Sequence, residues 1–242
     1  MHRNTQGLVL RETNYKETDK ILTVLTRDSG KLTVKARGCR RKNSPLAASA
    51  QLLVYSDMTL FEYRDYYTLN EADSLEQFWG VKSDVEKLAL CSYFAEVAEA
   101  VAPEGEADGG ILSLILNSIY ALDRLNKPAA LVKAAYELKL LCLAGYEPLL
   151  DACAICGVED PEDPRLDLSE GVLHCAGCPV GEGISMPLDG LSLGAMRHVV
   201  YGDPKRLFSF PMDAPRHEAH GGRLRGVFAD PTGAGVPHPG LL

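Results

Sequence analysis

Residues 21–36 read ILTVLTRDSGKLTVKA and contain two short runs of threonine, valine and leucine on either side of Asp28-Ser29-Gly30. Runs of this composition favour β-strands, and the Asp-Ser-Gly sequence favours a tight turn, so the stretch predicts a β-hairpin. Three further strand-like runs surround it, at residues 7–11, 58–63 and 66–69. Five short strands within residues 1–80 predict a small closed barrel of the OB type, because closure removes exposed strand edges.

After residue 80 the apolar residues recur with helical spacing. Residues 83–86 (SDVE) match a capping box, which predicts a helix with Ser83 as its N-cap and an end near residue 101. Further helical patterns cover residues 110–122, 128–145 and 191–201, and the acidic segment 159–164 is predicted to be irregular. The fold class expected is therefore α+β and multidomain, with an OB-fold over residues 1–80 and a helical domain over residues 81–210.

The chain has 242 residues, of which 46% are hydrophobic and 24% charged. This composition is that of a folded globular protein and excludes wholesale disorder. No run of 18 apolar residues occurs, and the first residues lack the apolar core of a secretory signal. We therefore expect a cytoplasmic protein without a membrane partner.

Charge is distributed unevenly along the chain. The net charge is −8, yet residues 1–42 hold eleven Lys or Arg against four Asp or Glu, a balance of +7 that leaves −15 for the other 200 residues. Such asymmetry favours a polyanion-binding module attached to an acidic body.

The densest basic cluster follows the second run of the hairpin. It consists of Lys35, Arg37, Arg40, Arg41 and Lys42. Lysine and arginine neutralise phosphates and release counterions, so the cluster predicts nucleic-acid binding in preference to an idle solvated surface. Several rings in the same region could stack on bases, although about half are expected to fill the barrel core and core packing is favoured for any one of them: Tyr55, Phe61, Tyr63, Tyr66 and Tyr67.

Four of the seven cysteines form two CxxC pairs separated by 18 residues: Cys153, Cys156, Cys175 and Cys178. This spacing is typical of a zinc site with four thiolates, and the alternative is a set of reduced or redox-active thiols. Because all four ligand positions are filled, Zn²⁺ would be structural rather than catalytic. The neighbouring His174 is expected to be a surface residue. We refer to residues 153–178 as the cysteine knuckle.

Catalytic motifs are missing from the sequence. It contains no GxxxxGKS/T, GxSxG or HExxH pattern, which favours a binding protein over an enzyme. Two alternatives remain open: a zinc-ribbon RNA-binding or transcription-associated adaptor, and a nuclease whose acidic residues converge only in the fold.

Several segments, in their order and spacing, resemble the RecO family of bacterial DNA repair proteins as far as about residue 210. They are residues 5–10 (TQGLVL), 19–23 (DKILT), 30–32 (GKL), 35–38 (KARG), 67–73 (YTLNEAD), 103–105 (PEG), 136–141 (YELKLL) and 145–148 (GYEP), together with the four knuckle cysteines. The resemblance implies an OB-fold, a helical domain with an inserted zinc knuckle, and binding to single- and double-stranded DNA. It also implies strand annealing, and partnership with RecR and single-strand binding protein in loading the recombinase RecA.

The tail departs from the family. Residues 211–242 are rich in Gly, Pro and His and lack periodicity, whereas the family ends in an amphipathic helix resembling YLLTQLERGFRTLDYY. If the last two bases of each codon are read with the first base of the next, residues 227–242 can encode that ending. The hypothesis is a frameshift near residues 212–215, which resequencing of the locus tests.

Overall fold

The computed structural model describes residues 1–64, 66–106, 109–179 and 183–209. By its internal contacts the chain divides into two compact units, one from Met1 to Val132 and the other from Lys133 onward, and each is described by itself. The predicted aberrant tail, residues 211–242, lies outside the described residues, and the domain boundary near residue 80 stays a prediction.

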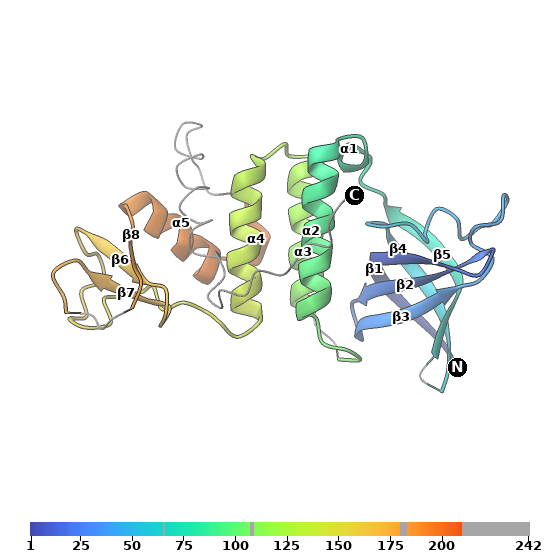
Figure 1. Ribbon diagram of the computed structural model, residues 1–242, viewed down its shortest axis with the longest axis horizontal. Helices are drawn as coiled ribbons and strands as arrows, with labels where there is room; N and C mark the ends of the chain where they lie inside the picture. The colour runs from blue at the N-terminus through green and yellow to red at the C-terminus, as the bar shows by residue number, and fades with distance from the viewer. Residues whose placement is uncertain (65, 107–108, 180–182, 210–242) are drawn as a thin grey trace, which may run out of the picture. The chain divides into compact units, whose positions relative to one another are not determined.

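The first unit contains a closed barrel of five strands (Figure 1). The strands are β1 (His2–Tyr15), β2 (Asp19–Thr26), β3 (Gly30–Ala36), β4 (Tyr55–Tyr63) and β5 (Tyr66–Glu76). Their order around the barrel is β1-β2-β3-β5-β4, with β3 and β5 parallel and every other pair antiparallel. This arrangement confirms the OB-like barrel that the five strand-like runs predict.

Strand β1 closes the barrel because it pairs with two partners. Its first half pairs with β4 and its second half with β2, and the register shifts between Val9 and Arg11. Such a bulge bends a strand, as closure of a small barrel requires. Alternate side chains point inward and form the core: Val9, Leu22, Val24, Leu32, Val34, Met58, Leu60 and Leu69.

Three helices complete the first unit: α1 (Trp79–Lys82), α2 (Val85–Val101) and α3 (Gly109–Asp123). The helix predicted from residue 83 begins one residue later than expected, because Asp84 is the N-cap and accepts from the amides of Glu86 and Lys87. Ser83 cannot cap it, since it ends α1 and its hydroxyl donates to the Gly80 carbonyl. The extended backbone that an N-cap needs occurs first at Asp84.

The second unit contains most of α4 (Ala129–Leu143), a small sheet and α5 (Gly190–Tyr201), followed by a 3-10 turn (Pro204–Arg206). The sheet has the order β7-β6-β8, from β6 (Pro164–Asp167), β7 (Val172–Cys175) and β8 (Ser185–Pro187). Sequence patterns miss these strands, which are three or four residues long. The segment predicted to be irregular ends one residue early, because Pro164 opens β6, a position where a strand tolerates proline.

Candidate nucleic-acid interface and metal centre

The basic cluster lies on the connection between β3 and β4. Lys35 is the penultimate residue of β3, whereas Arg37, Arg40, Arg41 and Lys42 follow the strand in a series of turns. We call residues 37–46 the basic loop. Its polar positions point outward because the side chains of Cys39 and Leu46 are buried in the barrel core, 3% and 7% exposed.

The basic loop is hydrogen-bonded to the turn between β1 and β2. The Gly38 amide donates to Oδ1 of Asp19 at 2.8 Å, and the Arg40 amide donates to the Thr18 carbonyl at 3.0 Å. The Arg40 guanidinium also donates to the Lys16 carbonyl at 3.3 Å. The hydrogen bond from the Gly38 amide holds the pKa of the Asp19 carboxyl below its ordinary value, and the hydrogen bond and charge of Lys35 act in the same direction. The loop and the turn therefore form one continuous surface.

Three of the five predicted phosphate-binding residues are fully available. Arg37, Arg41 and Lys42 are exposed and make no ion pair with any residue in the described part of the chain. Arg37 and Arg41 line a surface pocket of about 380 Å³ together with Asn70 of β5. Lys35 is different, since its ammonium pairs with Oδ2 of Asp19 at 3.2 Å. The predicted cluster is thus three free cations beside two that also hold the structure.

Other basic side chains of the barrel are occupied by contacts with α2. Arg11 pairs with Glu99 at 2.7 Å, and the Lys31 ammonium donates to the Glu99 carbonyl at 2.8 Å. The buried Thr23 hydroxyl donates to the same carboxylate at 3.5 Å. In OB-folds the outer face of strands 2 and 3 commonly binds oligonucleotides. Here α2 covers part of that face, whereas the basic loop and its neighbouring turn stay open.

The aromatic residues are less buried than the sequence predicts. Tyr55 and Tyr67 are half-buried, and Tyr67 packs against the barrel core as expected. Phe61, Tyr63 and Tyr66 are exposed, which contradicts the expected core role for these three. Phe61 is on the outward side of β4, because Met58 and Leu60 occupy the inward positions, and Tyr63 and Tyr66 form the last pair of the β4–β5 hairpin.

Tyr15 is a candidate that sequence reasoning missed. The residue is 41% exposed at the end of β1, and the ammonium groups of Lys35 and Lys16 lie over its ring, 4.8 and 5.5 Å from the ring centroid. Lys16 follows it in the chain, but Lys35 reaches it only through the pairing of β2 with β1 and β3. The available signal was an aromatic residue directly beside a lysine before a turn, which is weak on its own.

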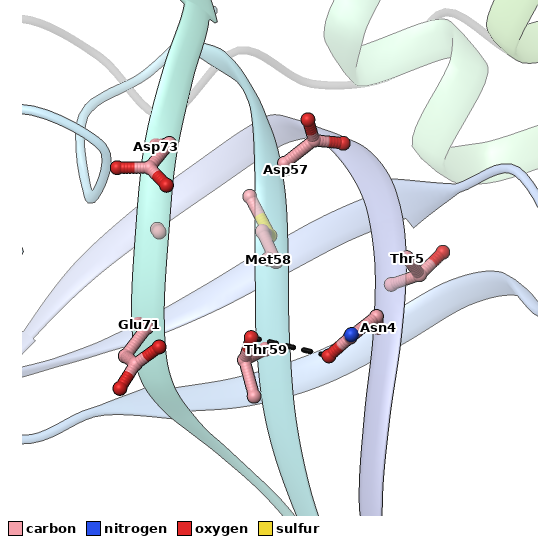
Figure 2. Close-up of a pocket in the computed structure, with 8 residues that line it drawn as sticks. Asn4, Thr5, Asp57, Met58, Thr59, Glu71 and Asp73 are labelled. Atoms are coloured by element: carbon pink, nitrogen blue, oxygen red, sulfur yellow. Dashed lines mark hydrogen bonds between the residues drawn. The ribbon is translucent and has the colours of Figure 1, made fainter.

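A second pocket of about 290 Å³ marks an acidic part of the barrel surface (Figure 2). Its carboxylates are Asp57 on β4 and Glu71 and Asp73 on β5. Asp57 is directly opposite Asp73 in the strand register, an arrangement of like charges that costs stability and repels anions. The barrel is therefore electrostatically polarised, with the basic loop offering phosphates a surface that this acidic patch does not.

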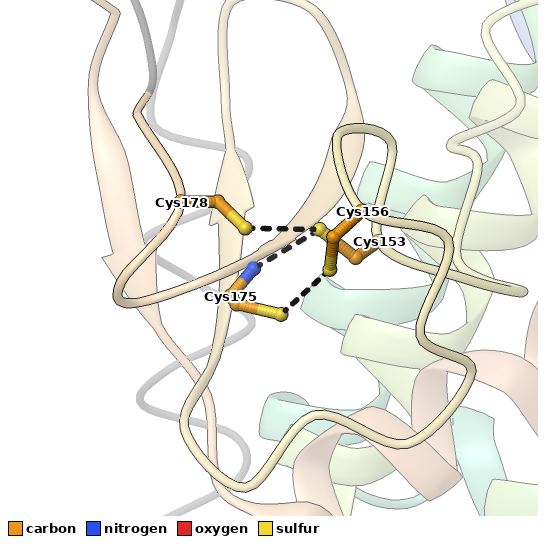
Figure 3. A group of neighbouring side chains, drawn as sticks. All are labelled: Cys153, Cys156, Cys175 and Cys178. Atoms are coloured by element: carbon orange, nitrogen blue, oxygen red, sulfur yellow. Dashed lines mark hydrogen bonds between the residues drawn. The ribbon is translucent and has the colours of Figure 1, made fainter.

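The four knuckle cysteines converge in the second unit (Figure 3). The Sγ atoms of Cys153 and Cys178 are 3.9 Å apart, those of Cys156 and Cys175 are 3.6 Å apart, and all four lie within 4.8 Å of one another. A tetrahedral ion with metal–sulfur bonds near 2.3 Å requires sulfurs about 3.8 Å apart. The cluster can therefore hold one metal ion, as the CxxC spacing predicts.

Backbone hydrogen bonds shape the first CxxC turn. The Gly157 amide donates to the Cys153 carbonyl at 2.9 Å, with Gly157 at a φ of +76°, a conformation that glycine adopts without strain. The Cys156 amide is directed at the Cys153 sulfur and lowers the pKa of that thiol to about 5. The adjoining Cys156 thiol raises the pKa of Cys175 to about 12. Four thiols this close cannot all be deprotonated, because the thiolates would repel one another. A divalent cation would offset this repulsion.

His174 is buried, which contradicts its expected surface position. Its side chain is 2% exposed, Nδ1 lies 3.0 Å from the Cys175 carbonyl, and Nε2 lies 2.9 Å from the Ser185 hydroxyl. The pairing of β6 with both β7 and β8 encloses the ring, and sequence patterns did not reveal this sheet. His174 is not in the cluster of possible metal ligands among the described residues, so it supports the knuckle without completing the site.

Arg197 of α5 secures the segment that carries the first cysteine pair. Its guanidinium donates to the Leu150 carbonyl at 2.7 Å, to the Asp151 carbonyl at 2.9 Å and to the Glu159 carbonyl. It also pairs with the Asp160 carboxylate at 2.7 Å. These contacts lie on both sides of Cys153 and Cys156, so they hold the two ends of the metal-binding turn together.

No helix in the described residues combines the length and apolarity that crossing a bilayer would require.

Comparison with known proteins gives consistent matches. Residues 1–78 match the family described as "Recombination protein O N terminal", and residues 82–224 match "Recombination protein O C terminal". The chain is similar to the "DNA repair protein RecO" of Acetivibrio thermocellus, with 30% identity over 206 residues that cover 85% of this chain and 82% of the relative. The chain is also similar to the protein of that name from Symbiobacterium thermophilum, with 33% identity over 230 residues that cover 93% of this chain and 86% of the relative.

Proposed function

Because the chain belongs to the RecO family of DNA repair proteins, we propose that it binds single- and double-stranded DNA through the basic loop and anneals complementary strands. We further propose that it helps to load the recombinase RecA onto DNA coated with single-strand binding protein, with RecR as a second partner. Family membership carries the role in DNA repair and recombination, and the partners rest on the family alone.

The observation that supports DNA binding is the set of free cations on the basic loop. Arg37, Arg41 and Lys42 are exposed without a carboxylate partner among the described residues, although the whole chain is acidic. Like charges that lie close together repel one another, so the cluster needs an anion to neutralise it. Phosphates fit this need, because binding releases condensed counterions and arginine can hold two phosphate oxygens.

The test is the salt dependence of binding to a fluorescent single-stranded oligonucleotide. The triple variant Arg37→Ala, Arg41→Ala, Lys42→Ala should bind more weakly at all salt concentrations. Loss of three phosphate contacts should also reduce the slope of log K against log salt by about 2, at about 0.7 per contact. The matched control is Arg37→Lys, Arg41→Lys, Lys42→Arg, which keeps every charge and should keep the slope.

An unchanged slope in the alanine variant would remove the basic loop from the interface. RNA of equal length serves as the comparison ligand, and a clear preference for RNA would favour the adaptor alternative instead. Annealing is tested separately, by pairing of complementary strands with and without single-strand binding protein. Loading is tested by the rate of RecA filament growth on coated DNA, which this protein together with RecR should increase.

We propose that the knuckle metal is Zn²⁺ in a structural role. Four thiolates at tetrahedral spacing are the donor set that zinc prefers, and no position remains for a reacting water. Elemental analysis should find about one zinc per chain, and replacing Cys156 and Cys175 by Ser should abolish it. A different metal in freshly purified protein would overturn the zinc assignment but leave the site.

We also propose that the protein acts in the cytoplasm by binding rather than by catalysis. This rests on the missing catalytic motifs and on the family role. Incubation with labelled DNA and Mg²⁺ should leave the DNA intact. Cleavage activity that persists through further purification of the protein would support the nuclease alternative.

A further inference from the structure

Four aromatic side chains of the barrel have more than a third of their surface exposed. They are Tyr15, Phe61, Tyr63 and Tyr66, at 41%, 39%, 58% and 77%. A single exposed ring needs no functional explanation, so exposure alone does not select among them. What distinguishes them is the charge around each ring and its connection to the basic loop.

Tyr15 lies among cations that are held in place. Lys35 has its ammonium 4.8 Å from the ring centroid, and the ion pair with Asp19 keeps it there. Lys16 contributes a second ammonium at 5.5 Å. Although both ammonium groups lie over the ring, Tyr15 as a residue is 41% exposed, so a ligand that carries a flat ring and a negative charge can reach it.

The position of Tyr15 relative to the basic loop is fixed by hydrogen bonds. Asp19 is directly opposite Tyr15 in the strand register, and its carboxylate accepts from the Gly38 amide. The carbonyls of Thr18 and Lys16 both accept from Arg40. The ring and the free cations of the loop therefore belong to one surface, on which a short strand of nucleic acid can contact both.

The hairpin tip offers a poorer setting for a polyanion. The Arg64 guanidinium carbon lies 5.2 Å from the centroid of the Tyr63 ring. The ring centroids of Phe61 and His2 are 5.5 Å apart. Asp57 and Phe61 alternate on the same outward side of β4, so the face that carries these rings continues into the acidic patch. A phosphate backbone laid along that face would meet carboxylates.

We propose that Tyr15 is a stacking position for an unpaired nucleobase while Arg37, Arg41 and Lys42 hold the adjoining phosphates, an inference that rests on the proposed DNA binding by the basic loop. Stacking on an aromatic side chain needs a base whose face is free. Bases within a duplex are already stacked, so Tyr15 adds affinity for single strands alone. The basic loop contacts both single-stranded and double-stranded DNA, and Tyr15 gives the preference for the single strand.

The test compares Tyr15→Ala with wild type on three ligands of equal length and charge per strand: a thymidine oligonucleotide, an abasic oligonucleotide and a duplex. Affinity for the thymidine strand should fall about 5- to 150-fold, the range expected for one stacked base. Affinity for the abasic strand and the duplex should change less than about twofold. Tyr15→Phe retains the ring and should restore binding to the thymidine strand.

The control is Tyr120→Ala, which removes a ring of similar exposure, 48%, from α3 and should leave all three affinities unchanged. An equal loss on the abasic strand would overturn the proposal, because the ring would then act on the shape of the loop. A loss with Tyr63→Ala but none with Tyr15→Ala would also overturn it. If wild type binds none of the ligands, the proposed DNA binding itself fails, a result distinct from both.

Discussion

The barrel and the cysteine knuckle both contain short antiparallel strands, but different forces hold them. The barrel has five strands in a closed ring around a contiguous apolar core, so its strands satisfy one another's backbone groups. The knuckle contains β6 and β7, which are four residues long, and few fully buried apolar residues, such as Leu166 and Leu173. Hydrophobic burial holds the first, whereas the second has four converging thiols that a metal ion could cross-link.

This difference also separates the functional surfaces. The basic loop is held by buried side chains, so its cations can change without loss of the fold. In the cysteine cluster the same four side chains would bind the metal and would hold the knuckle together. Substitutions should therefore affect binding alone in the barrel loop, but structure and metal together in the knuckle.

The largest effect is expected from removing the metal ligands. Cys156→Ser with Cys175→Ser should abolish metal binding and unfold the knuckle, because most of its folding free energy is metal-binding energy, about 10 kcal/mol or more in comparable zinc peptides. Hydrogen exchange should show loss of protection over residues 153–178, with barrel amides unchanged. Cys142→Ser, outside the cluster, is the control and should retain the metal. Equal loss of protection in the barrel would contradict the comparison.

A cavity in the barrel core should have the converse effect. Leu60 is fully buried, and Leu60→Ala should lower the free energy of unfolding of the barrel by about 2–5 kcal/mol. Thermal denaturation followed by the near-UV signal measures this, and metal content should stay unchanged. The smaller change Leu60→Met should cost less than about 1.5 kcal/mol. Metal loss from the alanine variant would show that the two regions are not independent.

An intermediate effect is expected where Arg197 supports the metal-binding turn. Arg197→Met removes the hydrogen bonds to both ends of the first cysteine segment and should weaken metal affinity about 10- to 100-fold. Competition with a chromogenic chelator measures the change, and the Co²⁺ spectrum should keep its tetrahedral form. Arg206→Met, an exposed arginine outside these contacts, should behave as wild type. No change in Arg197→Met would mean that the cysteines alone organise the turn.

The smallest effect concerns the junction between the basic loop and the β1–β2 turn. The Asp19 pKa is lower in the folded protein than in the unfolded chain, so its contribution to stability is present above the unfolded value near 4 and is lost as pH falls below it. Asp19→Asn should remove this part of the acid dependence. Denaturation of both proteins between pH 2 and pH 7 tests it, and identical slopes would show that Asp19 does not stabilise the junction.

The sequence was most informative where a short pattern carries its own physics. The strand-like runs on either side of Asp28-Ser29-Gly30 predicted the β2–β3 hairpin, and the CxxC spacing predicted the converging sulfurs. The pattern was least informative where a neighbour decides. The N-cap is Asp84 rather than Ser83 because Ser83 is the C-cap of α1, and His174 is buried because strands too short for a periodic signal enclose it.

By itself the sequence determined the barrel, the helices and the four-cysteine motif that can hold a metal ion, because strand period, helix period and cysteine spacing are local properties that nearby residues fix. Only the tertiary structure decided which cations are free. In the sequence, nothing distinguishes Arg11, Lys31 and Lys35 from Arg37 and Arg41. In the fold, Arg11 and Lys31 contact Glu99, and Lys35 pairs with Asp19. It also brought Tyr15 beside Lys35. These outcomes depend on side chains that are distant in the chain and adjacent in the fold, and Coulomb forces act through space rather than along the chain.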